Sequence, residues 1–161
     1  MWMNPTFDRM TPLSWRRLTA GERGLAAEVF GEALDAARVR VLALPLWPRA
    51  FVAGARLMVW PAAGAWADFA AAPVSLQAVF VHELTHVWQA QGGVFLPLAK
   101  LRAGDGPAAY AYDLVDGRAF GERNIEQQAM IVQHAFLSAR GHRAPHAPEL
   151  YAQASGAWRR N

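Results

Sequence analysis

Two histidines and a glutamate interrupt an apolar helical run in "QAVFVHELTHVWQAQGG", residues 77–93. His82 and His86 are four residues apart, so a helix places both imidazoles on one face, about one turn from each other. Two ring nitrogens in that arrangement can bind one metal ion. Glu83 lies about 100° further round the helix than His82. From there it can reach a metal-bound water and act as a general base.

The donor types indicate zinc. Imidazole and carboxylate ligands around one open position are typical of catalytic zinc sites. The chain has no cysteine, which excludes thiolate ligands, disulfides and thiol nucleophiles. The alternative is a chance match to the H-E-x-x-H pattern. That alternative must explain three ionisable groups within five residues of an apolar helix, where burial without a cation is unfavourable.

A catalytic zinc needs a third protein ligand, and the last predicted helix offers two candidates. Glu126 stands at the edge of the apolar stripe of that helix, which consists of Ile125, Ala129, Val132 and Phe136. Glu122 lies one turn earlier on the same face. We predict Glu126 as the ligand, with Glu122 as the alternative ligand or as a second carboxylate that orients a histidine.

Length and composition limit the class of protein. A chain of 161 residues is long enough for one domain with its own core. The net charge of +3 comes from scattered arginines without a basic face, so we expect no nucleic-acid partner. We find neither a signal-peptide pattern nor an apolar run of bilayer length, and we expect no membrane partner. A cytoplasmic protein is predicted, with export by a specialised, non-Sec secretion system as the alternative. The sequence does not determine the oligomeric state.

The chain divides into three predicted parts: an N-terminal arm over residues 1–18, a main domain over 19–140 and a C-terminal tail over 141–161, expected as a surface extension. Thr19 and Glu22 have capping-box spacing at the start of a first helix. The further expected elements are strands over 38–44 and 51–60, a central helix over 74–91, a hairpin turn at Asp116-Gly117 and a last helix over 121–140.

Several segments carry a resemblance to a known family. They are "VFGEALDAARVRV", "FVAGARLMVW", "HELTHVWQAQGG", "YAYDL" and "NIEQQAMIV", which lie within residues 15–140. With them the chain resembles the zincin-like metallopeptidases of the gluzincin type. More narrowly, it resembles the Vgr-related and Rhs-associated proteins of bacteria and the metallopeptidase-like core domain linked to contractile injection systems.

The resemblance implies a small α+β zincin-like domain. Such a minimal gluzincin has a short sheet whose edge strand holds extended peptide, a central H-E-x-x-H helix and a C-terminal glutamate helix. His82, His86 and Glu126 would be the zinc ligands and Glu83 the general base. Thermolysin-like gluzincins also carry an aspartate four residues after the ligand glutamate, where it braces a histidine. Here that position is Met130, so another group must brace the histidine, or none does.

The predicted function is a zinc-dependent metallopeptidase that hydrolyses peptide bonds by a zinc-bound water and the base Glu83. Its partner would be a peptide or protein substrate, held along the edge of the sheet at "FVAGARLMVW". The alternative is a zinc-stabilised interaction module, without catalysis, associated with a bacterial secretion or injection apparatus. A third possibility is an effector that cleaves cell-wall peptides. An open fourth zinc position would favour the enzymes over the module.

Overall fold

The computed structural model describes residues 9–159, and these form four strands and six α-helices, joined by loops and short 3-10 turns. The strands are β1 (Trp15–Arg17), β2 (Arg40–Leu44), β3 (Phe51–Ala53) and β4 (Leu57–Pro61). The helices are α1 (Ala20–Phe30), α2 (Val74–Gln91), α3 (Leu96–Ala103), α4 (Pro107–Tyr110), α5 (Ile125–Ala139) and α6 (Pro148–Ala154). The predicted α+β class is confirmed.

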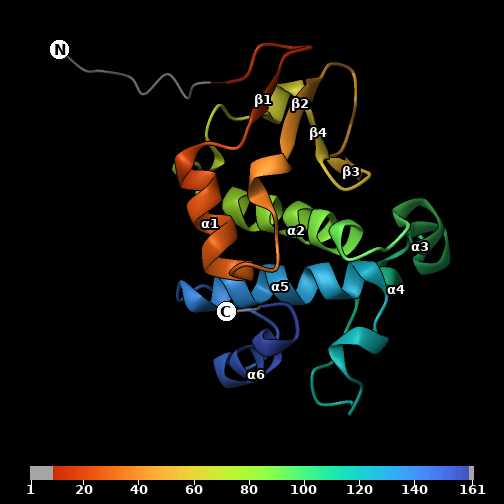
Figure 1. Ribbon diagram of the computed structural model, residues 1–161. Helices are drawn as coiled ribbons and strands as arrows, with labels where there is room; N and C mark the ends of the chain where they lie inside the picture. The colour runs from red at the N-terminus through yellow and green to blue at the C-terminus, as the bar shows by residue number, and fades with distance from the viewer. Residues whose placement is uncertain (1–8, 160–161) are drawn as a thin grey trace.

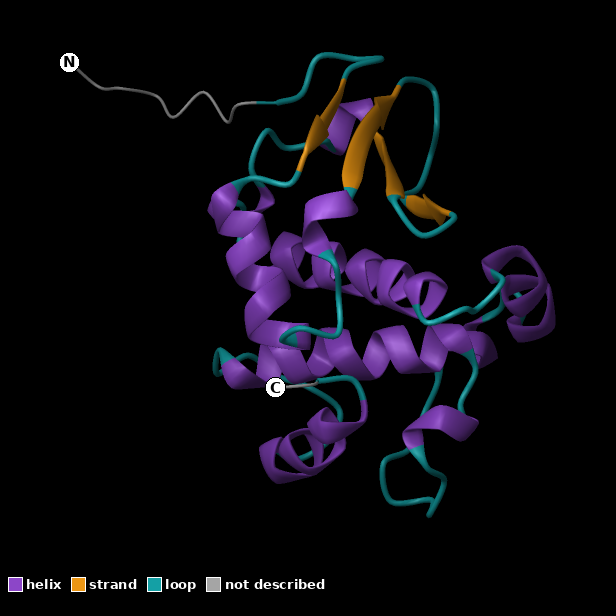
Figure 2. Ribbon diagram, in the orientation of Figure 1, coloured by secondary structure: helices purple, strands orange, loops and turns teal. Residues whose placement is uncertain are grey.

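Helix α2 runs through the middle of the molecule. The sheet lies on one side of it and α5 lies on the other (Figures 1 and 2). This position explains why α2 is apolar almost all round, because a helix with packed neighbours on both sides has little face left for solvent. The structure confirms the expected bounds of this helix, residues 74–91, and Gly92 follows as its C-cap.

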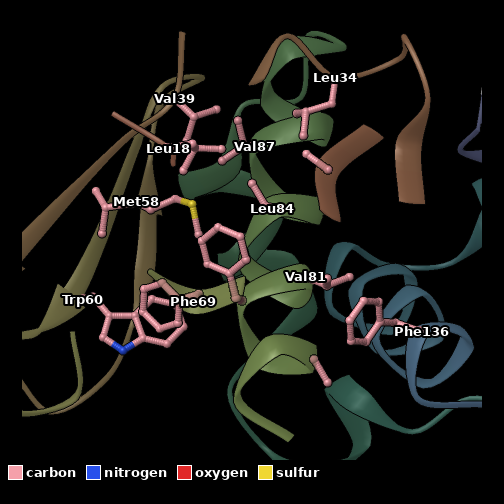
Figure 3. Close-up of a cluster of buried hydrophobic side chains, with 14 of the residues drawn as sticks. Leu18, Leu34, Val39, Met58, Trp60, Phe69, Val81, Leu84, Val87 and Phe136 are labelled. Carbon is pink, nitrogen blue, oxygen red and sulfur yellow. The ribbon is translucent and has the colours of Figure 1, made fainter. Parts of the chain in front are cut away.

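The core lies in two layers, one on each side of α2 (Figure 3). Met58, Trp60 and Phe69 fill the space between the sheet and α2, and each is at most 5% exposed. Val81 and Phe136 pack where α2 meets α5. Close packing of this kind fixes a helix in position, since cores are packed at crystal-like density. The two histidines and the glutamate of α2 are therefore carried on a rigid element.

The strand order in the sheet is β1-β2-β4-β3, with β2 and β4 parallel and the outer pairs antiparallel. The predicted single strand over residues 51–60 is divided in two. Gly54 has φ +66°, a conformation that glycine adopts without strain, and the chain turns back there so that Phe51 pairs with Val59. Strand β3 is therefore an edge strand, as expected for this segment, whereas β4 lies inside the sheet.

The predicted hairpin at Asp116-Gly117 is wrong. A turn is present, with φ +78° at Gly117, but no strand flanks it: residues 107–110 form α4 and residues 111–119 are irregular. The Arg123 guanidinium donates to both carboxylate oxygens of Asp116 and stabilises the loop. Pro107 at the first turn of α4 starts a helix here, because its fixed φ suits that position.

The residues after 141 do not form the surface extension that the sequence suggested. They include α6, which packs against α5, and its Tyr151 is only 2% exposed. Trp158 is likewise buried, at 3% exposed. The predicted division into arm, domain and tail stays a prediction. Within the arm, β1 pairs with β2, while residues 1–8 lie outside the described residues.

Candidate metal centre

Helix α2 presents His82 and His86 side by side, with their ring centroids 5.0 Å apart. Both residues are buried, at 8% and 7% exposed, and Glu83 is 8% exposed. The four-residue spacing brings the imidazoles together on one face, as the sequence predicted. All three side chains line a cavity of about 950 Å³. This cavity lies between the β3 edge and α3, and α2 and α5 contribute to its walls.

Glu126 comes from the first turn of α5. Asn124 caps this helix: its side chain accepts a hydrogen bond from the Gln127 N–H, and the Gln127 side chain accepts one from the Asn124 N–H. This capping box fixes where α5 begins. Glu126 is fully buried, and its Oε2 lies 3.3 Å from His82 Nε2 and 3.4 Å from His86 Nε2. The predicted ligand set therefore meets at one point between α2 and α5.

Two of the separations within this cluster have the length expected between ligands of one zinc ion. A tetrahedral zinc binds nitrogen and oxygen ligands at about 2.0–2.1 Å, so two of its ligand atoms lie about 3.3–3.4 Å apart. The two distances from Glu126 Oε2 match this separation, and the three donor atoms all lie within 4.8 Å of one another. Three protein donors are also the number found in catalytic zinc sites, which keep one position open.

The electrostatics of the cluster favour positive charge at the same point. Burial by itself raises the pKa of Glu126, but the contacts with His82 and His86 outweigh burial and hold that pKa well below its usual range. Burial lowers the pKa of His86, but the hydrogen bond to Glu126 and the negative charges of Glu83 and Glu126 together outweigh burial and raise that pKa overall. Both shifts have one physical meaning: a carboxylate buried between two imidazoles stabilises a cation beside them.

Gln89 braces His86, and sequence reasoning missed it. His86 Nδ1 lies 2.8 Å from Gln89 Oε1, while Gln89 Nε2 donates to the carbonyl oxygen of Ile125 and to Gln128 Oε1. Because the Ile125 carbonyl can only accept, Gln89 must present its oxygen to His86, and Nδ1 must carry the proton. In the neutral ring Nε2 then carries the lone pair, which is the form in which a histidine binds a metal ion. The sequence signal that could have identified Gln89 is its position three residues after His86, which places both side chains on the same face of the helix.

We expect Gln89→Leu to weaken zinc binding about 10- to 100-fold, the usual cost of removing a group that orients a metal-ligating histidine. Competition against a chromophoric chelator measures the affinity. The matched control is Gln91→Leu, a glutamine of the same helix whose hydrogen bonds go to Asp35 and Ala55 rather than to a histidine. Equal zinc affinity in the Gln89→Leu variant and the wild type would contradict this role.

Glu83, the predicted general base, follows His82 on α2. It lines the cavity, and its Oε2 is buried without a hydrogen-bond partner among the described residues. A buried carboxylate oxygen without a partner is unfavourable, so its presence in a cavity wall indicates a place for a ligand or a substrate proton. Within residues 9–159, His82 Nδ1 is a second buried atom of this region without a hydrogen-bond partner.

The alternative ligand Glu122 does not join the cluster. It is exposed, in a 3-10 turn that precedes α5, and its carboxylate accepts a hydrogen bond from the Ala119 N–H. The sequence placed Glu122 on the same helix face as Glu126 because the last helix was expected to begin at residue 121. The Asn124 cap starts it at Ile125 instead, so the expected alignment of the two glutamates does not exist.

The other histidines lie away from the centre. The His134 ring accepts or donates at Nδ1, 2.6 Å from the Tyr112 hydroxyl, which also lies 2.7 Å from the Tyr151 hydroxyl. The His146 ring lies near the same tyrosines, tilted against Tyr112 and edge-on to Tyr151. These contacts attach α6 to α5. Tyr112 thus serves the contact between α5 and α6, whereas the nearby Tyr110 lines the cavity.

This chain is similar in sequence and in structure to a protein of a bacterial secretion system. The chain is 34% identical over 134 residues to the type VI secretion system spike protein VgrG2b of Pseudomonas aeruginosa. This alignment covers 76% of the chain and 13% of the spike protein, so the chain spans about an eighth of the length of that relative. The effector domain of Pseudomonas aeruginosa VgrG2b has a similar fold, with a TM-score of 0.69 and 28% identity over 96% of this chain and 89% of that domain.

No protein-family model matches the chain. Among the described residues, no helix has the length and apolar character needed to cross a bilayer. The Vgr-related part of the predicted resemblance is confirmed by the two matches, whereas the zincin part stays a prediction. In sequence and in fold, this chain is therefore a homologue of the VgrG2b effector domain.

Proposed function

We propose that the chain is a secretion-system effector domain that hydrolyses peptide bonds with the help of one zinc ion. The observation that carries this proposal is the convergence of His82 Nε2 and His86 Nε2 on Glu126 Oε2, at 3.3 and 3.4 Å. That separation suits ligands of a tetrahedral zinc. The relationship to an effector domain of a type VI spike protein supports the association with a secretion apparatus and export by that route.

The residues have distinct parts in this reaction. His82, His86 and Glu126 would hold the ion, and Gln89 keeps His86 in the tautomer that offers Nε2. When bound, zinc supplies Lewis acidity, which lowers the pKa of water toward neutrality and polarises a carbonyl. Glu83 accepts the proton of the attacking water at its unpartnered Oε2 and passes it to the leaving amine.

The cavity suits an extended peptide. Strand β3 borders it and pairs with β4 alone among the described strands, so the other edge of β3 can accept a further strand. Main-chain hydrogen bonds along such an edge bind a peptide without regard to its sequence. Trp47 and Phe51, with ring centroids 5.4 Å apart, lie beside this edge and provide apolar contact for a side chain of the substrate.

The direct test is hydrolysis of a peptide library by the zinc-loaded chain, with products identified by mass spectrometry. We expect cleavage that a chelator stops and that added zinc restores. A library that includes cell-wall stem peptides distinguishes an effector acting on the cell wall from one acting on proteins. Complete absence of cleavage by a chain that holds stoichiometric zinc would contradict the proposed activity.

A second candidate function is a zinc-stabilised interaction module that cleaves nothing. The match to a spike protein favours it, since such a match supports association with the apparatus irrespective of activity. In that case the ion would serve stability alone, and Glu83→Gln would leave both the fold and the association with the apparatus unchanged. The open cavity beside the donors and the unpartnered Glu83 Oε2 lead us to place the enzyme first.

A further inference from the structure

Lys100 is the sole lysine of a chain with fifteen arginines. It lies on α3 (Leu96–Ala103), in the long segment between α2 and α5, and α3 packs against both of these helices. Lys100 lines the cavity, and its ammonium group reaches the carboxylate of Glu126. The ammonium group of Lys100 therefore lies beside the candidate ligand Glu126, in a chain whose other strongly basic side chains are all arginines.

The contacts of Glu126 divide between its two oxygens. Lys100 Nζ donates a hydrogen bond to Oε1, whereas His82 Nε2 and His86 Nε2 both approach Oε2. Lys100 Nζ also lies 3.4 Å from the Tyr110 hydroxyl, which limits where the ammonium can move. The carboxylate is therefore held with one oxygen toward the cavity wall and the other toward the histidines.

This division matters because a carboxylate can bind a cation through one oxygen or through both. A group that occupies Oε1 leaves only Oε2 for the ion and prevents rotation about the terminal bond of the side chain. Lysine suits this part because its ammonium is a point charge that can contact a single oxygen. Arginine does not, because its planar fork binds both carboxylate oxygens at once and would compete for Oε2.

We propose that Lys100 is a positioning residue: its contact with Oε1 fixes the Glu126 carboxylate so that Oε2 alone is offered to the metal. This inference rests on the metal site of the proposed function and deepens it. It assigns a function to the α3 segment, which separates the H-E-x-x-H helix from the glutamate helix. A positive charge at position 100 is therefore insufficient to position Glu126 for the metal. The contact of a lysine ammonium with a single carboxylate oxygen is also required.

The test compares zinc binding by the wild type, Lys100→Met and Lys100→Arg. We expect Lys100→Met to lose affinity about 10- to 100-fold, as for other groups that orient a metal ligand. Lys100→Arg is expected to lose at least as much, although it keeps the charge. Chelator competition gives the affinity, and the visible absorption of the cobalt-substituted proteins reports a change of coordination. The control is Arg102→Met, an exposed cation on the same helix, which should bind zinc like the wild type.

The outcomes separate this inference from the proposed function. If the wild type binds no stoichiometric metal, the metal site and the positioning role both fail. If the wild type binds zinc and Lys100→Met binds it equally tightly with the same cobalt spectrum, the positioning role is overturned while the site stands. If Lys100→Arg restores wild-type affinity, charge alone is sufficient and the geometric claim is wrong. Circular dichroism of the chelated proteins checks that each variant is folded.

Discussion

Glu83→Gln is expected to abolish peptide hydrolysis while leaving zinc bound. The amide has nearly the shape of the carboxylate but cannot accept the proton of the attacking water, and removal of a general base costs about 100- to 10,000-fold in rate. Zinc should stay because Glu83 lies outside the cluster formed by His82, His86 and Glu126. The measurements are kcat/KM on a peptide found in the library experiment and the zinc content by elemental analysis.

The matched control is Glu122→Gln, the same substitution at an exposed glutamate that precedes α5. It should keep both zinc and turnover. Unchanged turnover in Glu83→Gln would remove Glu83 from the reaction. Loss of zinc in Glu83→Gln would show instead that Glu83 belongs to the ligand set, and the assignment of roles within the H-E-x-x-H motif would have to be revised.

Zinc is expected to raise the melting temperature of the wild-type chain by about 5–10 °C. At a free zinc concentration one hundred times Kd, binding to the native state stabilises it by about 2.7 kcal/mol. Each kcal/mol shifts the Tm of a domain of this size by roughly 2–4 °C. Differential scanning calorimetry with zinc and with chelator gives the shift, provided that unfolding is reversible.

Glu126→Gln should remove most of this zinc-induced shift, because a neutral amide oxygen is a weak zinc ligand. Glu122→Gln should keep the whole shift, since the Glu122 carboxylate lies on the protein surface and accepts a hydrogen bond from the Ala119 N–H. The pair of variants thus identifies the third ligand directly. A full shift in Glu126→Gln, together with a lost shift in Glu122→Gln, would reverse the assignment that the geometry supports.

Local sequence patterns determined the elements whose causes are local. The capping box of Thr19 and Glu22 started α1 where it was expected, because the hydrogen bonds of a cap form between residues three apart. The bounds of α2 followed from an apolar run closed by Gly92-Gly93. The pairing of His82 with His86 needed only helix geometry. The spacing and type of these residues were sufficient to predict two donors for one ion.

In two segments, local sequence signals led to a wrong prediction because tertiary contacts decided the structure. The hairpin at Asp116-Gly117 was expected from turn chemistry, but the flanking residues found partners on α5 and in their own loop rather than in each other: the Tyr112 hydroxyl lies beside His134, and Arg123 binds Asp116. Likewise, the residues after 141 had the composition of a loose tail. Tyr151 and Trp158 are nevertheless buried, because burial of large aromatic side chains stabilises a docked segment.

The sequence by itself determined that one helix carries two imidazoles and a carboxylate suited to metal chemistry. Only the tertiary structure decided which distant groups complete that centre. Glu126 rather than Glu122 reaches the histidines because α5 begins at Ile125, after the Asn124 cap, and lies along α2. Lys100 reaches Glu126 because α3 packs against α5. Helix geometry relates residues within a few positions of one another, whereas contacts across 26, 40 or 44 positions depend on how whole helices pack, and no short-range pattern encodes that packing.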